Sequence, residues 1–285
     1  MKTILIPIDF SSHSHITAHF GLELAKRVNA RVLLLHVEQP SAPVPAFGIP
    51  VVELSTWNDE LNREMTQALQ FFQDQLSDFR RQQNLDSVPM STRLVAGNPA
   101  DGILEVAETE KASFIIMGTI GAANVWDKLL GSVTSVVAQR ANRPVWIIPQ
   151  EIKLDSLRRV AYFADMEGNE MSCINQVMNL GERLQSALEV VHVAPVTNEE
   201  EEDAFIDTIV DSFEDAYDSV RITFRHLTAE SISEGIESYV RAHSPDAIVL
   251  AHRDRSFVQN LFHTSLIRHL SLTTKRPMLV IPKTS

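Results

Sequence analysis

The chain repeats itself, and this repetition constrains its fold more than any other feature of the sequence. Residues 143–149 (RPVWIIP) recur 133 positions later as residues 276–282 (RPMLVIP). Residues 35–37 (LHV) recur 156 positions later as residues 191–193 (VHV). Repetition of this kind indicates two similar structural units joined in tandem, which we call the first copy and the second copy.

The two copies differ in length. The first is 23 residues longer (156 − 133), and the extra residues lie between Val37 and a strand near Leu94. Several prolines and a glycine predict that residues 39–50, which we call the insert, form a stiff loop. We expect one domain over residues 1–150 and a second over residues 156–285, with a short link between them.

Each copy alternates apolar segments with amphipathic ones. The apolar runs lack the alternation of a half-buried strand, which is typical of parallel strands covered on both faces. We expect strands at residues 3–8, 31–37, 92–96, 114–117 and 145–148, and again at residues 159–164, 187–193, 221–226, 247–251 and 278–281. This order predicts an α/β fold of two tandem doubly wound domains, each a five-stranded parallel sheet with helices on both faces.

Composition excludes several classes of function. No apolar stretch approaches the roughly 20 residues that span a bilayer, and the first apolar run is too short for a signal peptide. The single cysteine, Cys173, cannot form an internal disulfide and fits a reducing compartment. A formal net charge of −12 argues against a nucleic-acid surface. We therefore expect a cytoplasmic protein that binds neither membranes nor nucleic acid.

A glycine motif follows the fourth strand of the first copy. Gly118 and Gly121 come first, and after nine further residues the run 131–134 (GSVT) opens a helix. Doubly wound sheets bind ligands at the carboxyl ends of their strands, and a helix start offers N–H groups to phosphate. Plain turns would also explain the glycines, and Ser132 and Asp9 are compatible with helix caps. The joint spacing favours a phosphate ligand.

The motif has a familiar spacing, G-x-x-G, nine residues, then G-S, over residues 118–132, and it resembles the ATP-binding signature of universal stress proteins. Residues 7–11 (PIDFS) and Val37 at the end of the second strand match that family as well. The resemblance covers nearly the whole chain in two copies. It implies the fold of the adenine nucleotide alpha hydrolases and an ATP-binding, regulatory role in the stress response.

The resemblance also implies a site. Adenine would lie near Asp9, with the backbone of Val37 reading its polar edge, and the phosphates would lie on the glycine motif. One ATP per chain is implied, with Mg²⁺ or Mn²⁺ bound through the phosphates, and no catalytic residue or protein metal ligand. The implied nucleotide-binding residues are Pro7, Ile8, Asp9, Val37, Met117, Gly118, Gly121, Gly131, Ser132, Val133 and Thr134. Met117 also fits a plain core position.

The second copy departs from this motif. Larger residues replace its three glycines: Ala251, Asp254 and Thr264. Asp165 and Ser265 keep the residue types of Asp9 and Ser132. The added side chains fill space that phosphates need, and an inward Asp254 would repel them, so we expect no ATP there. The basic segment around residues 252–263 leaves open a different anion or partner, or a solvated loop.

Two other functions stay open on the sequence alone. A slow ATPase would use the same phosphate contacts, although no Ser/His/Asp arrangement or pair of carboxylates points to hydrolysis. A nucleotide-free interaction scaffold would resemble the second copy. His15 and His19, four residues apart, are more simply surface histidines than metal ligands.

In the leading hypothesis, nucleotide orders the insert and changes a surface for an unknown protein partner. The family pairs its last strands, so we expect residues 145–148 to pair with residues 278–281 inside the chain, which would protect both edges. Two such chains would then form a homodimer.

Overall fold

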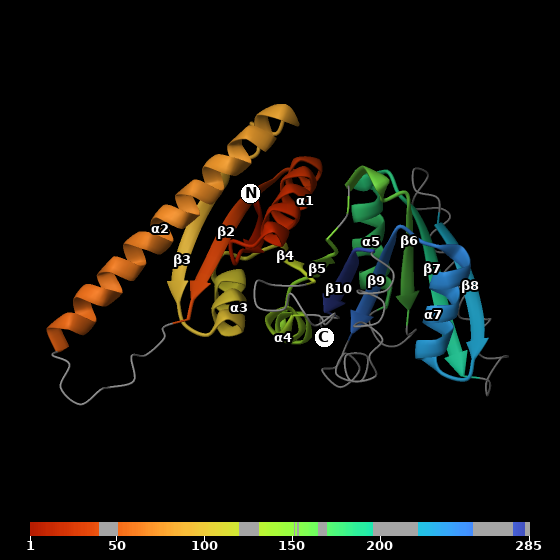
Figure 1. The fold of residues 1–285 in the computed structure, drawn as a ribbon. Coiled ribbons are helices and arrows are strands. Elements are labelled where there is room, and N and C mark those ends of the chain that lie inside the picture. Colours follow the sequence, from red (N-terminus) through yellow and green to blue (C-terminus); the bar gives the residue numbers. More distant parts are fainter. Residues whose placement is uncertain are drawn as a thin grey trace. The chain divides into compact units, whose positions relative to one another are not determined.

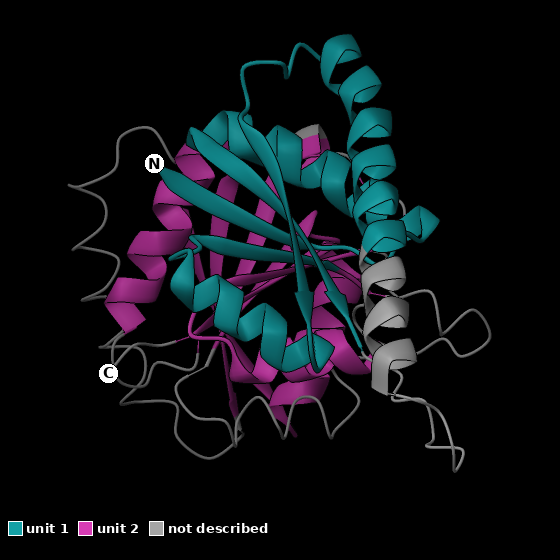
Figure 2. Cartoon of the chain, turned by 90° about the vertical axis from the view of Figure 1, so that its left-hand side faces the viewer, with its two compact units in different colours: residues 1–117 teal, residues 118–285 magenta. Residues whose placement is uncertain are grey.

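The computed structural model describes residues 1–39, 51–119, 131–150, 152, 154–164, 170–195, 222–252 and 276–282, with the backbone alone for residues 51–62, 155, 195 and 252. Residues 40–50 of the insert, Gly121, Asp165, Asp254, Thr264 and Ser265 therefore lie outside the described residues. The chain divides into two compact units, residues 1–117 and residues 118–285 (Figure 2). The predicted domain boundaries, 1–150 and 156–285, stay a prediction.

The first unit alternates strands and helices (Figure 1). Its elements are β1 (Lys2–Pro7), α1 (Ser12–Val28), β2 (Ala30–Glu38), α2 (Val51–Gln82), β3 (Met90–Ala96), α3 (Pro99–Thr109) and β4 (Phe114–Gly118), whose last residue opens the second unit. The strands are parallel and hydrogen-bonded in the order β3-β2-β1-β4. Strand order reverses between β1 and β4, which is the point where doubly wound sheets bind ligands.

The second unit continues the pattern. Its described elements are α4 (Ser132–Arg140), β5 (Val145–Ile148), the 3₁₀ turn η1 (Leu154–Ser156), β6 (Arg159–Ala164), α5 (Glu170–Leu184), β7 (Ala187–Pro195), β8 (Ile222–Ala229), α7 (Ile232–His243), β9 (Ala247–His252) and β10 (Met278–Pro282). The strand order is β5-β10-β9-β6-β7-β8. These strands are parallel except at β5–β10, where Trp146 lies opposite Leu279 in an antiparallel pair. The predicted pairing of the two last strands inside one chain is thus confirmed.

Helices cover both faces of the sheet in the first unit. A Cβ added to Gly21 of α1 would collide with Ile6, whereas a Cβ added to Gly102 of α3 would lie 3.0 Å from Val37. Ile6 pairs with Leu34 across β1 and β2, so Val37, three residues further along β2, points to the opposite face. Helices also cover both faces of the sheet in the second unit. Gly235 of α7 packs against Val193, whereas Glu170 of α5 accepts a hydrogen bond from Tyr162 on the other face.

Each predicted strand forms, within three residues of its expected ends, and the α/β class with a doubly wound parallel sheet is confirmed. The reason is visible in the cores: Ile4, Leu5 and Ile6 of β1 are fully buried, as continuous apolar runs in parallel strands require. The helix predicted after Asp9 is α1, and Ser11 caps it by accepting a hydrogen bond from the Ser14 N–H. No helix in the described part of the chain is both long and apolar enough to cross a bilayer.

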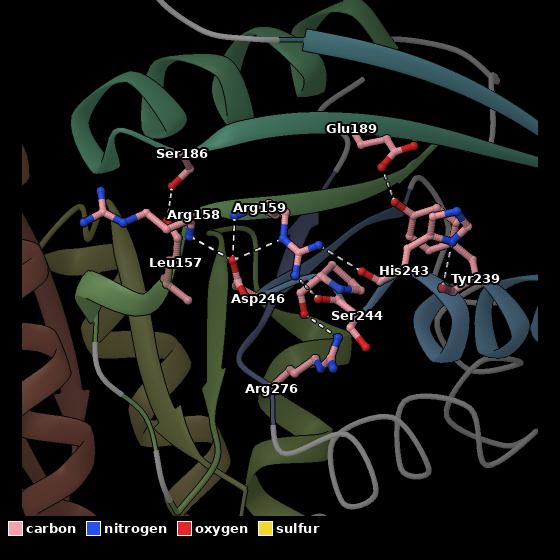
Figure 3. A network of polar contacts seen from close by, with 11 residues as sticks. Leu157, Arg158, Arg159, Ser186, Glu189, Tyr239, His243, Ser244, Asp246 and Arg276 are labelled. Carbon is pink, nitrogen blue, oxygen red and sulfur yellow. Dashed lines mark hydrogen bonds and ion pairs between the residues drawn. The ribbon is translucent and has the colours of Figure 1, made fainter.

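The link into the second copy is tied to its sheet by backbone groups (Figure 3). Ser186 donates to the carbonyl of Leu157 at 2.5 Å, and Leu157 itself is 1% exposed. The Asp246 carboxylate accepts from the backbone N–H groups of Arg158 and Arg159 at 3.1 and 2.8 Å. Buried apolar side chains and charge-assisted hydrogen bonds therefore fix where β6 begins.

Candidate functional site

The turn between β1 and α1 holds Asp9 in a closed set of hydrogen bonds. One carboxylate oxygen, Oδ1, accepts from the Ser11 N–H at 3.1 Å, the Ser11 hydroxyl at 2.6 Å and the Ser14 hydroxyl at 2.7 Å. The Asp9 N–H in turn donates to the Ser14 Oγ at 3.1 Å. Asp9 is exposed and caps no helix, because Ser11 fills that position. The carboxylate is thus presented at the carboxyl edge of the sheet in one fixed orientation.

The residue after Asp9 has a strained backbone. Phe10 has φ of 60°, a left-handed conformation that is uncommon for a bulky residue. Its ring lies 4.6 Å from the ring of His36 and 6.3 Å from that of Phe72, centroid to centroid. Such strain persists only where neighbouring contacts enforce it, so the aromatic neighbours hold the turn that presents Asp9.

The end of β2 is tied to the same turn. Ile8 donates its N–H to the Leu35 carbonyl at 2.8 Å, and Nδ1 of His36 lies 2.8 Å from the Ile8 carbonyl. A carbonyl only accepts, so Nδ1 is the donor. Val37, the predicted reader of the adenine edge, follows His36 and rests against Gly102. Pro7, Ile8, Asp9 and Val37 therefore end neighbouring parallel strands, as the sequence predicts.

Met117 and Gly118 end β4, the strand on the other side of β1. Met117 is 5% exposed, which agrees with its reading as a core residue. The carbonyl of Gly118 accepts a hydrogen bond from the Thr134 hydroxyl at 2.9 Å. Thr134 is one of the predicted phosphate contacts, and its hydroxyl proton ties the start of α4 to the end of β4.

The start of α4 is set by this tie and by one backbone bond, from the Gly131 N–H to the Thr119 carbonyl at 2.9 Å. Gly131 is the N-cap residue, and within the described residues no side chain caps this helix. Side chains do cap α1, α3 and α7, through Ser11, Asn98 and Ser231. Ser132 is therefore the first helical residue rather than the cap, and it is exposed.

Gly131 does not need to be glycine for its backbone. Its φ of −54° and ψ of 141° are accessible to any L-residue. Since the first N–H groups of a helix have no intrahelical acceptor, an anion can bind at such a helix start.

The two histidines considered as metal ligands have another role. The His15 ring stacks on Phe72 and the His19 ring on Phe79, with centroid distances of 4.3 and 3.6 Å, so both help to pack α1 against α2. Burial, and then the charge of His15, lower the pKa of His19 to about 4. No group of three potential metal ligands occurs among the described residues. The expectation of plain surface histidines was wrong in part, because α2 covers them.

The second copy keeps the scaffold and changes the polar residues on it. Nδ1 of His192 lies 3.0 Å from the Ala164 carbonyl, which repeats the bond between His36 and Ile8. At the position of Ser14 the second copy has Glu170, which is 1% exposed and accepts a hydrogen bond from Tyr162. The sequence reasoning missed this pair, and it also missed Ser14. The signal was available for both, since 170 − 14 equals the repeat spacing of 156.

Comparison with known proteins accounts for this arrangement. The family model described as the universal stress protein family matches residues 1–149. The chain belongs to the universal stress protein family. A universal stress protein of Methanocaldococcus jannaschii is 32% identical over 152 residues, which are 53% of this chain and 84% of that protein. One of Thermus aquaticus is 32% identical over 149 residues, 52% of this chain and 98% of that protein.

A solved structure extends the likeness of fold to the whole chain. A universal stress protein of Archaeoglobus fulgidus matches 99% of this chain and 97% of its own with a TM-score of 0.68, at 18% identity. At this level of identity the match shows the fold alone. The fold of nearly the whole chain therefore occurs in a solved structure.

Proposed function

We propose that this universal stress protein binds one adenine nucleotide, ATP, through its first copy and uses it as a regulatory ligand. The observation that carries the proposal is the start of α4. It has no side-chain cap among the described residues, and its N-cap is a glycine whose backbone does not require glycine. It follows the strand end that family members use for phosphate. A triphosphate would supply the acceptors that the helix start lacks.

The residues at the end of β1 fit the other part of the ligand. Asp9 is an exposed carboxylate, which accepts hydrogen bonds from ribose hydroxyls or an exocyclic amine. Val37 lies beside it at the end of β2 and offers backbone groups for a base edge. The predicted contacts include Met117 and Gly118, which are consecutive residues of β4.

Any Mg²⁺ or Mn²⁺ would enter with the phosphates. Mg²⁺ keeps several waters and is usually bound through substrate phosphates and one or two carboxylates. Its contribution would be to neutralise phosphate charge beside an acidic protein with a net charge of −12. The full set of proposed contacts stays that of the sequence: Pro7, Ile8, Asp9, Val37, Met117, Gly118, Gly121, Gly131, Ser132, Val133 and Thr134.

The second copy is proposed to bind no ATP. Ala251 occupies in β9 the position that Gly118 has in β4. The buried Glu170 adds a carboxyl group at the start of α5, the helix that follows β6. Nucleotide occupancy would therefore be one per chain. We propose that occupancy alters a surface for a protein partner or for a second chain.

The decisive experiment measures nucleotide in the purified full-length chain. Protein is denatured, and released nucleotide is identified by chromatography and mass and counted per chain. Calorimetry with Mg-ATP on nucleotide-free protein then gives the affinity. We expect about one ATP per chain, and loss of it in Gly131→Val, because the added side chain occupies the phosphate space while φ and ψ suit valine.

A matched pair of serines on α4 provides the control. Ser132→Ala removes a hydroxyl at the helix start, and Ser135→Ala removes one from the next turn, where the N–H already donates to Gly131 O. We expect weaker binding only for the first. A chain that carries no nucleotide and ignores added Mg-ATP overturns the proposal, and two ATP per chain overturns the single-site assignment.

A further inference from the structure

Ser14 touches Asp9 at two points. Its hydroxyl donates to the carboxylate oxygen Oδ1 at 2.7 Å and accepts from the Asp9 backbone N–H at 3.1 Å. A hydroxyl has one proton and two lone pairs, so a single Oγ atom can make both bonds at once. Ser14 is 6% exposed, so it acts from beneath Asp9 and not as a surface residue that meets ligand directly.

The backbone on both sides of Asp9 is already fixed. Before it, Ile8 is bonded to Leu35 and His36 at 2.8 Å each. After it, Phe10 is held in a left-handed conformation by its ring contacts. The side-chain torsions of Asp9 are the freedom that remains, and hydrogen bonds to Oδ1 remove it. Of its two serine donors, Ser14 is the buried one.

We infer that Ser14 is a positioning residue of the nucleotide site, which fixes the Asp9 carboxylate in the orientation that meets the adenosine part of the ligand. The inference rests on the proposed function and adds to it a residue outside the glycine motif. Holding a binding group in one orientation before the ligand arrives avoids the entropy cost of ordering it on binding. Ser14 therefore acts on affinity through Asp9.

The second copy supports the same assignment from the opposite side. Glu170 occupies the position of Ser14 and is bonded to Tyr162. Its carboxyl oxygen accepts from Tyr162, so this side chain does not supply the hydroxyl that orients Asp9 in the first copy. The copy whose glycine motif has been replaced is thus also the copy that lacks this hydroxyl. Two separate parts of the site differ together between the copies.

The test is a double-mutant cycle on the full-length chain, with Mg-ATP binding measured by calorimetry. Ser14→Ala should weaken binding about tenfold, the worth of one hydrogen bond to a charged group. In a background of Asp9→Ala, the same substitution should change affinity less than about twofold, because the group it positions is gone. Ser77→Ala is the matched control, a helical serine that donates to its own helix at Gln73 O.

A second variant covers a failure of Ser14→Ala to fold. Ser14→Cys keeps the shape but is a weak donor, and we expect an intermediate affinity with an unchanged melting temperature. Equal losses in the wild-type and Asp9→Ala backgrounds would show a merely structural role and overturn the inference. Wild-type affinity in Ser14→Ala would overturn it as well, while leaving the proposed function intact. A wild-type chain that ignores Mg-ATP overturns both.

Discussion

The two copies share the contacts that shape the carboxyl edge of the sheet, and they differ in the polar residues near that edge. In both, a histidine of the second strand bonds the carbonyl that ends the first strand, through His36 and His192. In both, a helical glycine packs on a valine, as Gly102 does on Val37. Because these contacts persist without the glycine motif, they serve the fold. The differences, such as Ser14 against Glu170, point to the ligand.

The same lesson applies to the charged contacts of α3 and α7. In the first copy the carboxylate of Glu110, the C-cap residue of α3, binds two strand arginines, Arg31 at 2.6 Å and Arg93 at 2.9 Å. In the second copy the carboxylate is on the strand: Glu189 binds Arg225 and the hydroxyl of Tyr239. Burial opposes charge on Glu189, but the hydrogen bonds from Tyr239 and Arg225 lower its pKa. Attachment of the helix is retained, and the residues that provide it are not.

The largest effect is expected at the pair that only the second copy has. Tyr162→Phe removes the hydroxyl that donates to the buried Glu170, which should cost about 2 kcal/mol of unfolding free energy because a buried carboxyl group loses a donor. The measurement is urea unfolding with hydrogen exchange of the β6 amides. Tyr239→Phe is the control. Its partner Glu189 is partly exposed, so this substitution should lower the unfolding free energy by less. Equal costs would contradict the comparison.

A smaller difference in stability is expected between alanine substitutions of two helix glycines, Gly235 and Gly102. Gly235→Ala would place a methyl group against Val193 and 3.1 Å from the Cβ of Ala229, and should cost about 1–2 kcal/mol. For Gly102→Ala the three nearest atoms all belong to Val37, the closest at 3.0 Å, and the gain in helix propensity of about 1 kcal/mol should offset most of the cost. Melting temperatures of the two variants rank them. The reverse order would show that the helices pack differently in solution.

Mild acid should weaken the first copy through His19. Burial and His15 lower the pKa of His19 to about 4, so the folded state prefers the neutral ring. The stability that the neutral His19 ring contributes is fully present above the unfolded pKa of 6.5, and it is lost as the pH falls from 6.5 towards 4. For a half-exposed ring we expect on the order of 1 kcal/mol after solvent screening.

His19→Asn tests this prediction and installs the residue of the second copy, Asn175. The variant should flatten the pH dependence of hydrogen exchange in α1 between pH 6.5 and 4 and leave that of α5 unchanged. A slope that persists in the variant would assign the acid sensitivity to another group.

The smallest effect is expected at Glu38. Its carboxylate lies 3.1 Å from Nε2 of His36, but the second copy has Ala194 at the corresponding position and keeps the histidine bond. Glu38→Ala should therefore change the unfolding free energy by no more than about 0.5 kcal/mol, as for other partly exposed polar contacts. The urea midpoint measures this, and a loss above 1 kcal/mol would contradict it.

The sequence predicted most of the fold because the determinants are local. Apolar runs set β1 and its counterparts, and the repeated RP strands pair as β5 and β10. The site was predicted less completely. His36 bonds Ile8 across 28 residues, and Thr134 bonds Gly118 across 16, so neither contact follows from a pattern along the chain.

Residue type did not locate the helix caps at two positions. Ser132 and Asp9 are good cap residues, but Gly131 and Ser11 hold the cap positions, since a cap depends on backbone geometry at the helix start. The repeat spacing would have found Ser14, because it aligns that serine with Glu170, a charged residue in an otherwise buried helix face. Only the structure shows that both side chains are buried.

The antiparallel contact of β5 with β10 joins two strands of one polypeptide. In a symmetric homodimer every substitution appears on both sides of the interface, and neither subunit can change alone. Here a substitution appears once. Trp146 faces Leu279 rather than another tryptophan, so the asymmetry already reaches the interface itself. A gene of this design can lose a ligand from one side while selection maintains it on the other, without dissolving the contact that holds the strands together.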